Sequence, residues 1–156
     1  MQLQQDSTYR LVTIQTTDVH QYAQVEALRQ VLVTVGYENS PQRHIDESAE
    51  IFLLYFGSEP VATVRVLHKP GVSFYFGRLA AKKTSPNSRH GFEIMKRVLE
   101  ILLKRAQPQE EIWAVSQPNV FAFHAKIACL PTGAPFVHSG ALVNKIVFCR
   151  ETWQKL

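Results

Sequence analysis

The chain has 156 residues, of which 46% are hydrophobic and 19% are charged, with a formal net charge of +4. This length fits one domain, and this balance is ordinary for a protein with a packed core, which excludes disordered, collagen-like and disulfide-stabilised chains. No apolar run approaches the ~18 residues of a transmembrane helix, and the N-terminus lacks the basic and apolar regions of a signal peptide. Cys129 and Cys149 have no CxxC companion, so we expect reduced core thiols, no metal site and a cytoplasmic location.

The first strand is predicted over Tyr9–Thr16, where apolar side chains surround β-branched ones. Asp18 follows as an expected N-cap, because its short carboxylate can accept the backbone N–H groups of a first helical turn. Apolar residues then recur at helical spacing until Gly36, a natural stop: Val19, Tyr22, Val25, Leu28, Leu32 and Val35. The polar segment Tyr37–Ser48, which holds Pro41, predicts a loop or a short irregular helix.

A β-hairpin is the clearest local pattern in the chain. Its strands are predicted over Glu50–Phe56 and Val61–Leu67, and the turn between them is Gly57–Pro60. A second turn at Lys69–Gly71 leads into a further strand over Ser73–Ala81. These three strands are therefore expected to be antiparallel neighbours in one sheet.

A central helix is predicted to begin near Thr84, with Ser85 as its cap and Pro86 at its first position, where a missing N–H costs nothing. Its expected buried face consists of Ile94, Met95, Val98, Leu99 and Leu102. The next strand is predicted over Ile112–Ser116.

The last part of the chain predicts one short helix and one strand. The helix is expected from Pro118 to about Cys129, where Pro131 and Gly133 end it, and the strand over Leu142–Cys149. The resulting order, β-α-(loop)-β-β-β-α-β-α-β, indicates a single α/β (α+β) domain over residues 1–156. Its sheet is expected to be mixed, antiparallel at first and partly parallel later, with helices flanking it.

Basic residues cluster between Arg78 and Arg97, where Glu93 is the one acidic residue. The six basic residues are Arg78, Lys82, Lys83, Arg89, Lys96 and Arg97. Such a stretch suits a phosphorylated cofactor or an acidic partner protein, and it equally suits a solvated helix flank. No helix-turn-helix or aromatic-interleaved basic pattern accompanies it, so we expect neither a nucleic-acid nor a membrane partner.

Three segments together resemble the GNAT (N-acetyltransferase) superfamily, in an order and spacing that extend over nearly the whole chain. Phe76–Ala81 resembles the strand that lies along the pantetheine arm of acyl-coenzyme A. Ser116–Cys129 resembles the strand end and helix that carry an Asn and then a Phe-Tyr pair, and Gly133–Gly140 resembles the closing segment before the last strand. The resemblance implies an N-acyltransferase that moves an acetyl or acyl group from acetyl-CoA or acyl-CoA to a primary amine.

The donor signature of that family, (Gln/Arg)-x-x-Gly-x-(Gly/Ala), falls on Pro86–Gly91, where only Gly91 matches. In the family, N–H groups at a helix N-terminus hold a pyrophosphate there. Arg89 replaces a glycine and would either obstruct this cradle or bind phosphate itself. The donor-binding residues that the resemblance implies are Leu79, Ala80, Ala81, Asn87, Ser88, Arg89, His90, Gly91 and Asn119.

His124 stands where the family has a tyrosine that protonates the departing thiolate. A histidine suits that role, because its ordinary pKa of ~6.5 makes both protonation states accessible, but it could equally be a hydrogen-bonded helix residue. Glu47 is the first candidate for the general base, ahead of Asp46 and Glu93, although each could be a solvated surface carboxylate.

Two alternatives remain open from the sequence. The acyl-homoserine-lactone and N-acyl amino acid synthases share this fold, lack the glycine signature and take their acyl group from an acyl carrier protein, which the basic stretch would suit. The chain could also be a non-catalytic GNAT-fold module for ligand binding or protein interaction. Within the enzyme reading, the acceptor is a small-molecule or peptide amine, and a homodimer is common in the family.

Overall fold

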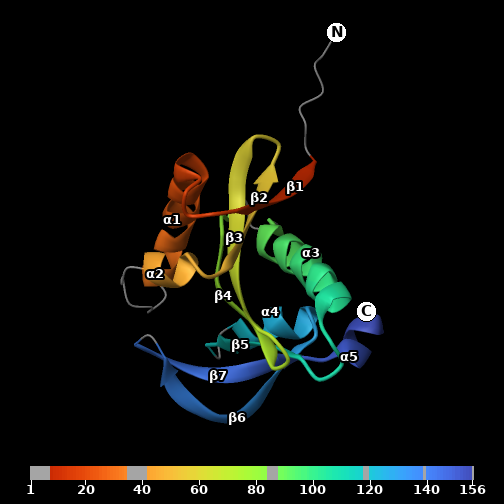
Figure 1. Cartoon of the computed structure of the whole chain (residues 1–156). Coiled ribbons are helices and arrows are strands. Elements are labelled where there is room, and N and C mark those ends of the chain that lie inside the picture. The colour runs from red at the N-terminus through yellow and green to blue at the C-terminus, as the bar shows by residue number, and fades with distance from the viewer. Residues whose placement is uncertain (1–7, 35–41, 84–87, 118–119, 139, 156) are drawn as a thin grey trace.

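The computed structural model describes residues 8–34, 42–83, 88–117, 120–138 and 140–155. A seven-stranded sheet in the order β1-β2-β3-β4-β5-β7-β6 forms its centre (Figure 1). The strands are β1 (Tyr9–Ile14), β2 (Glu50–Phe56), β3 (Glu59–Lys69), β4 (Ser73–Ala81), β5 (Glu111–Ser116), β6 (Cys129–His138) and β7 (Ala141–Phe148). The helices are α1 (Val19–Thr34), α2 (Arg43–Asp46), α3 (His90–Arg105), α4 (Phe121–Lys126) and α5 (Arg150–Gln154).

The sheet is mixed, as the sequence predicted. β4 and β5 form its parallel pair, and α3 is the crossover that a parallel connection requires. The other neighbouring strands pair in an antiparallel manner. In Figure 1, β5, β7 and β6 run across the lower end of β3 and β4, so the sheet changes direction at the parallel pair.

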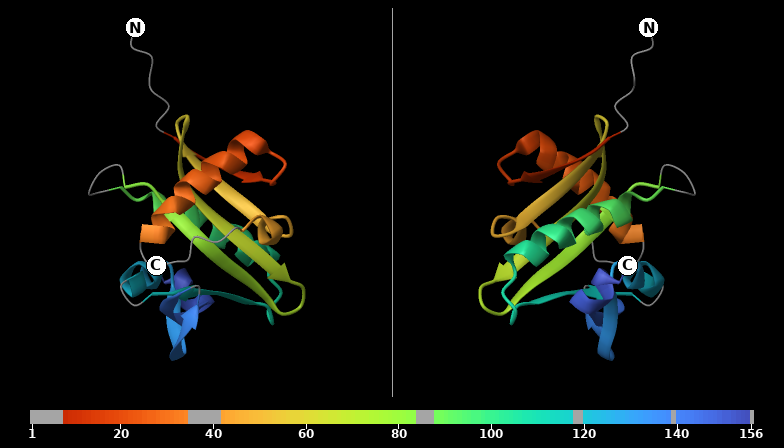
Figure 2. Two further views of the ribbon diagram at one scale, coloured as in Figure 1. Left: turned by 90° about the vertical axis from the view of Figure 1, so that its left-hand side faces the viewer. Right: turned by 90° about the vertical axis from the view of Figure 1, so that its right-hand side faces the viewer.

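Each face of the sheet is covered by a different helix, with α1 on one side and α3 on the other (Figure 2). β2 has both faces buried, so its side chains alternate between the two layers. Ile51, Leu53 and Tyr55 join the cluster under α1, whereas Phe52 and Leu54 join the larger cluster under α3.

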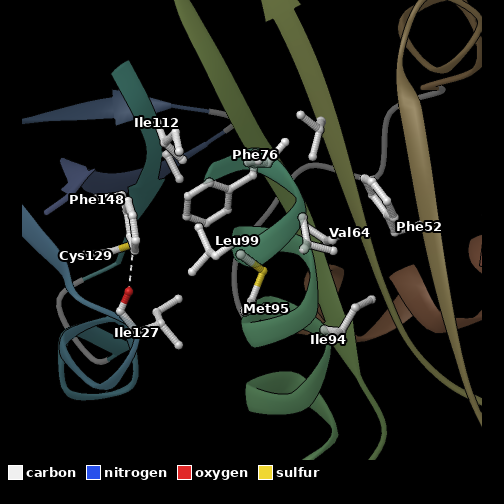
Figure 3. Packing of buried hydrophobic residues seen from close by; sticks show 14 of the residues in the cluster. Phe52, Val64, Phe76, Ile94, Met95, Leu99, Ile112, Ile127, Cys129 and Phe148 are labelled. Atoms are coloured by element: carbon white, nitrogen blue, oxygen red, sulfur yellow. Dashed lines mark hydrogen bonds between the residues drawn. The ribbon is translucent and has the colours of Figure 1, made fainter. Parts of the chain in front are cut away.

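The larger cluster holds the predicted apolar face of the central helix. All five of its residues are completely buried, and Figure 3 shows Met95 and Leu99 between Phe76 of β4 and Val64 of β3. The helix begins at His90, while Ser85 and Pro86 lie outside the described residues. None of the helices in the described part of the chain has the length and apolar character needed to cross a bilayer.

The start of α1 lies where it was predicted, but one residue of its apolar face does not. Asp18 directly precedes the helix, its backbone carbonyl accepts the N–H of Tyr22 at 2.8 Å, and its carboxylate accepts the N–H of Gln15 at 2.8 Å. Val19 leaves 76% of its surface exposed, because the buried stripe of α1 starts at Tyr22 and continues through Val25 and Leu28. The polar segment after α1 contains α2, within the predicted loop or short helix.

The C-terminal part contains two elements that the sequence analysis missed. β6 occupies residues expected to follow a helix, and the helix itself is shorter than predicted, ending at Lys126. Pro131 and Gly133 do not prevent a strand here, because β6 lies at the edge of the sheet and pairs with β7 alone. A proline in an edge strand can turn the side that lacks an N–H away from the neighbouring strand, so no hydrogen bond of the sheet is lost. The chain then forms α5 after β7.

Candidate functional site

A cavity of about 460 Å³ opens where β4 and β5 separate. The two strands are paired only from Ser73 to Tyr75 and from Glu111 to Trp113. Beyond this point, β4 lines the cavity through Leu79 and β5 lines it through Ser116. Residues of α1 and α2 also line the cavity, and so do residues of α4.

A β-bulge in β4 forms one wall of this cavity. Arg65 of β3 is opposite Gly77, but Thr63 is opposite Ala80, so β4 carries an extra residue between these pairs. Arg78 lies in this bulge with φ +51°, a left-handed conformation that costs a non-glycine residue about 1–2 kcal/mol. Beyond Tyr75, none of the described strands pairs with the edge of β4 that is turned away from β3.

His124 lines the cavity from α4, with only 7% of its surface exposed. Its Nδ1 lies 3.1 Å from the carbonyl oxygen of Val120, which can only accept, so the proton is on Nδ1. Nδ1 also lies 2.8 Å from Oγ of Ser116, whose hydroxyl donates to the carbonyl of Gln117. Nε2 is therefore the unprotonated nitrogen. Burial lowers the pKa of His124 to about 4, so the imidazole is neutral at pH 7.

The α2 end of the cavity is bordered by a buried charge cluster. Asp46 accepts two hydrogen bonds from Arg29, at 2.7 and 3.1 Å, one from Tyr22 and a longer one from Arg65 at 3.3 Å. Burial alone would raise the pKa of Asp46, but the hydrogen bonds from Arg29 and Tyr22 and the nearby arginine charges outweigh it and lower this pKa. Asp46 is thus an ionised anchor that joins α1, α2 and β3.

None of the three carboxylates considered as a general base lies in the cavity wall. Asp46 is occupied by the hydrogen bonds described above. Glu47 is exposed and pairs with Arg43 at 3.6 Å, and Glu93 pairs with Arg97 at 2.9 Å on α3. Among the described residues that line the cavity, there is no Asp or Glu at all. The structure therefore does not bring the predicted base, Glu47, to the place where His124 lies.

The predicted donor loop leads into the N-terminus of α3. Ser88 and Arg89 precede the helix. The side chain of Arg89 is exposed, and its guanidinium lies 4.7 Å from the ring centroid of Phe92. His90 is buried, with its Nδ1 2.8 Å from the hydroxyl of Tyr9, so its ring is part of the packing rather than of an open loop. Burial lowers the pKa of His90.

Gly91, in the first turn of α3, lies beside Phe123, a residue of the cavity wall. A Cβ at this position would lie 3.5 Å from Cβ of Ala81 and 3.8 Å from the ring of Phe123, which itself lines the cavity. Leu79 lies in the cavity wall, whereas Ala80 is buried in the cluster under α1. The predicted donor-binding residues Asn87 and Asn119 lie outside the described residues.

Three cationic or titratable residues of the cavity wall were missed as site residues. They are Arg65 of β3, Arg78 of β4 and His138 of β6. Arg65 could have been found, because it is the one charged residue in the apolar run VATVRVL, and a charge in a strand buried on both faces needs a functional or ionic partner. Arg78 and His138 gave no comparable signal, since their position depends on the bulge and on the missed strand β6.

The low pKa of His124 makes a testable contribution to stability. The pKa of a histidine in the unfolded chain is about 6.5, whereas the pKa of His124 in the folded protein is about 4. Stability is therefore fully present above pH 6.5 and decreases as the pH falls below it, by about 2 kcal/mol between pH 7.5 and pH 5 for this residue. We expect His124→Gln to remove that part of the pH dependence in urea unfolding measurements.

The exposed His20 provides the matched control for this measurement. His20→Gln should keep the pH dependence of the unmodified protein. An undiminished dependence in His124→Gln would contradict the buried, neutral imidazole.

Comparison with known proteins identifies the fold. No protein-family model matches the sequence, and no curated protein is similar to it. Among solved structures, a putative N-acetyltransferase from Lactobacillus plantarum has a TM-score of 0.73 at 18% identity, covering 90% of this chain and 97% of that one. FeeM, an N-acyl amino acid synthase from uncultured soil microbes, has a TM-score of 0.73 at 13% identity, with 95% and 94% covered.

A third similar structure is BjaI, a coenzyme A-dependent acyl-homoserine lactone synthase, solved with S-adenosylmethionine (SAM) and isopentyl-CoA. Its TM-score is 0.66 at 14% identity, and the match covers 95% of this chain and 87% of BjaI. The chain therefore has the GNAT fold that these N-acyltransferases share, as its sequence pattern predicted.

Proposed function

We propose that this protein is an N-acyltransferase that transfers an acyl group from acyl-coenzyme A to a primary amine. The observation that carries this proposal is the cavity at the separation of β4 and β5. It combines a stretch of β4 that no described strand pairs with on the cavity side, which suits a ligand with successive amide groups, with walls from α1 and α2 as well as from α4, which suits two substrates that meet between them.

The donor is proposed to enter from the side of α3 and α4. There the amide groups of its pantetheine arm would pair with the β4 edge near Leu79, and its phosphates would lie at the first N–H groups of α3. Lys83 and Arg89 are exposed on this side and supply positive charge. BjaI, which has a similar fold, is a coenzyme A-dependent synthase, and this supports coenzyme A as the donor.

The reaction needs a proton to move from the amine to the sulfur. As the amine nitrogen attacks the thioester carbonyl carbon, a C–N bond forms and the nitrogen must lose a proton. As the C–S bond breaks, the leaving thiolate must gain one. We propose His124 for both transfers, because its Nε2 is unprotonated, its Nδ1 is fixed by Val120 and Ser116, and no carboxylate is present among the described lining residues.

Donor binding should depend on Arg89. We expect Arg89→Glu to weaken the affinity for acetyl-CoA by about tenfold or more, because it replaces a phosphate-binding charge by a repelling one beside the α3 N-terminus. Isothermal titration calorimetry at low and moderate salt measures this, with Lys104→Glu as the control at an exposed position on the same helix. Equal losses in both variants would contradict the donor assignment.

Turnover should depend on His124 without a matching loss of donor affinity. His124→Phe fills the same buried volume but cannot carry a proton, so we expect kcat to decrease by about 100-fold or more, the usual range for a lost acid-base group. The measurement is thiol release from acetyl-CoA in the presence of an accepted amine, alongside a calorimetric Kd for the donor. Unchanged turnover would assign His124 a purely structural role.

An acyl carrier protein is the second candidate donor. The helix start of this chain has Arg89 in place of a glycine, and Lys83, Arg89 and Lys96 are exposed cations that suit an acidic partner. If acetyl-CoA does not bind, titration with an acylated carrier protein distinguishes this donor from a non-catalytic module, which would bind neither.

A further inference from the structure

One part of the cavity wall is apolar and belongs to neither of the two buried clusters. This apolar compartment is formed by half-buried side chains of α2, β3, β4 and β5, namely Ile45, Leu67, Tyr75 and Val115. None of the four is a member of the cluster under α1 or of the larger cluster under α3. The packing of the two cores therefore does not account for this stretch of apolar wall.

The apolar compartment lies on the face of the sheet that α1 covers. Side chains alternate between the two faces along a strand, and the strand neighbours of Leu67, Tyr75 and Val115 point into the cluster under α3. These neighbours are Val66, Phe74, Phe76 and Ala114. Ser116 shares the α3 face, and its hydroxyl contacts His124. His124 and the apolar compartment are thus on opposite faces of the sheet, as are α1 and α3 in Figure 2.

The cavity wall has no group that would bind a second positive charge on the acceptor. The described lining residues include no Asp or Glu, and Asp46, which does not line the cavity, is already held by two arginines and a tyrosine. The attacking amine must be neutral, but a further ammonium group on the same molecule would stay charged near the guanidinium of Arg65. Burying such a charge without a partner is costly, which disfavours polyamines.

We propose that the acceptor is an apolar primary monoamine, an alkyl or aryl-alkyl amine whose one charged group is the amine itself. This inference rests on the proposed acyltransferase function. The donor is proposed to enter from the side of α3 and α4, so the opposite face is left for the acceptor. The amine nitrogen approaches Nε2 of His124, and the apolar body fills the apolar compartment, where it gains affinity by leaving water.

Three amines of equal length separate apolar contact from polarity and charge. Hexylamine, 5-aminopentan-1-ol and 1,5-diaminopentane differ only at the far end, which is a methyl, a hydroxyl or a second ammonium group. Acyl transfer from acetyl-CoA is followed by thiol release, and binding of each amine without donor is followed by calorimetry. We expect kcat/KM for hexylamine to exceed that for the alcohol by about tenfold and that for the diamine by about 100-fold, with the same order in affinity.

Two substitutions make the apolar compartment less apolar, and each has a matched control. Val115→Thr replaces a methyl group by a hydroxyl, and Leu67→Thr shortens a second apolar side chain. The controls are Val72→Thr in the turn between β3 and β4 and Leu142→Thr in β7, at exposed positions that do not line the cavity. We expect each compartment variant to reduce the preference for hexylamine over the alcohol about fivefold, and the controls to leave it unchanged.

The outcomes distinguish this inference from the proposed function. Equal or greater efficiency with the alcohol or the diamine would overturn the apolar acceptor and leave the acyltransferase proposal intact. Binding that prefers hexylamine and depends on Leu67 and Val115, without donor binding or transfer, would support the apolar amine site and overturn the enzyme. A preference that persists in both compartment variants, or the absence of binding and transfer for all three amines, would overturn the site.

The acyl chain of the donor is the competing occupant of the apolar compartment. Repeating the transfer measurement with hexanoyl-CoA in place of acetyl-CoA tests it. If the compartment holds the amine, the longer acyl chain should compete with hexylamine and lower the rate. If Val115→Thr and Leu67→Thr instead reduce the use of hexanoyl-CoA and leave the preference among the amines unchanged, the compartment belongs to the acyl chain and the inference is overturned.

Discussion

The early end of the parallel pairing between β4 and β5 is the constraint on which the rest of the site depends. Three residue pairs hold the strands together, and the bulge at Arg78 then redirects β4. Because β4 is already paired with β3 on its other edge, the separation leaves a strand edge facing a cavity instead of a neighbour. The two apolar clusters on either face of the sheet keep this opening in place, since α1 and α3 pack on the strands beside it.

The electrostatics of the cavity suit a reaction that depends on positioning rather than on a strong acid or base. His124 lines the cavity and is neutral, with its Nδ1 held by hydrogen bonds, and the carboxylate Asp46 is occupied by arginines. Backbone dipoles and fixed cations can stabilise charge as it develops on a thioester without reorganising. An uncharged proton carrier then suffices, because the proton only has to pass from nitrogen to sulfur.

The sequence predicted the parts of the fold that have a strong local pattern. The hairpin of β2 and β3 alternates around a clear turn, and the buried face of α3 follows helical spacing, so both were found. β6 was missed because its prolines and glycine resemble a loop, and only its edge position makes a strand acceptable there. Val19 at the start of α1 was wrongly placed on the buried face, because the position of the buried stripe depends on how the helix packs on the sheet.

The roles that the sequence predicted for the site residues stay predictions. The structure places His124 and Leu79 in the cavity wall, whereas Glu47 is an exposed partner of Arg43. The register of β3 brings Arg65 to the cavity, and the bulge in β4 brings Arg78 there. The register and the bulge are not local properties of the sequence. The carboxylates illustrate the same limit, because Asp46, the last residue of α2, is buried, whereas Glu47, which directly follows this helix, is exposed.

The most direct test of the central claim, that the opening between β4 and β5 holds the acyl donor, is amide hydrogen exchange with and without coenzyme A. A donor in this cavity would cover the free β4 edge and the first turn of α3. We expect slower exchange at residues 76–79 and 88–92 on addition of coenzyme A, with little change in β1 and β2. Unchanged exchange at both segments, under conditions where coenzyme A binds, would contradict it.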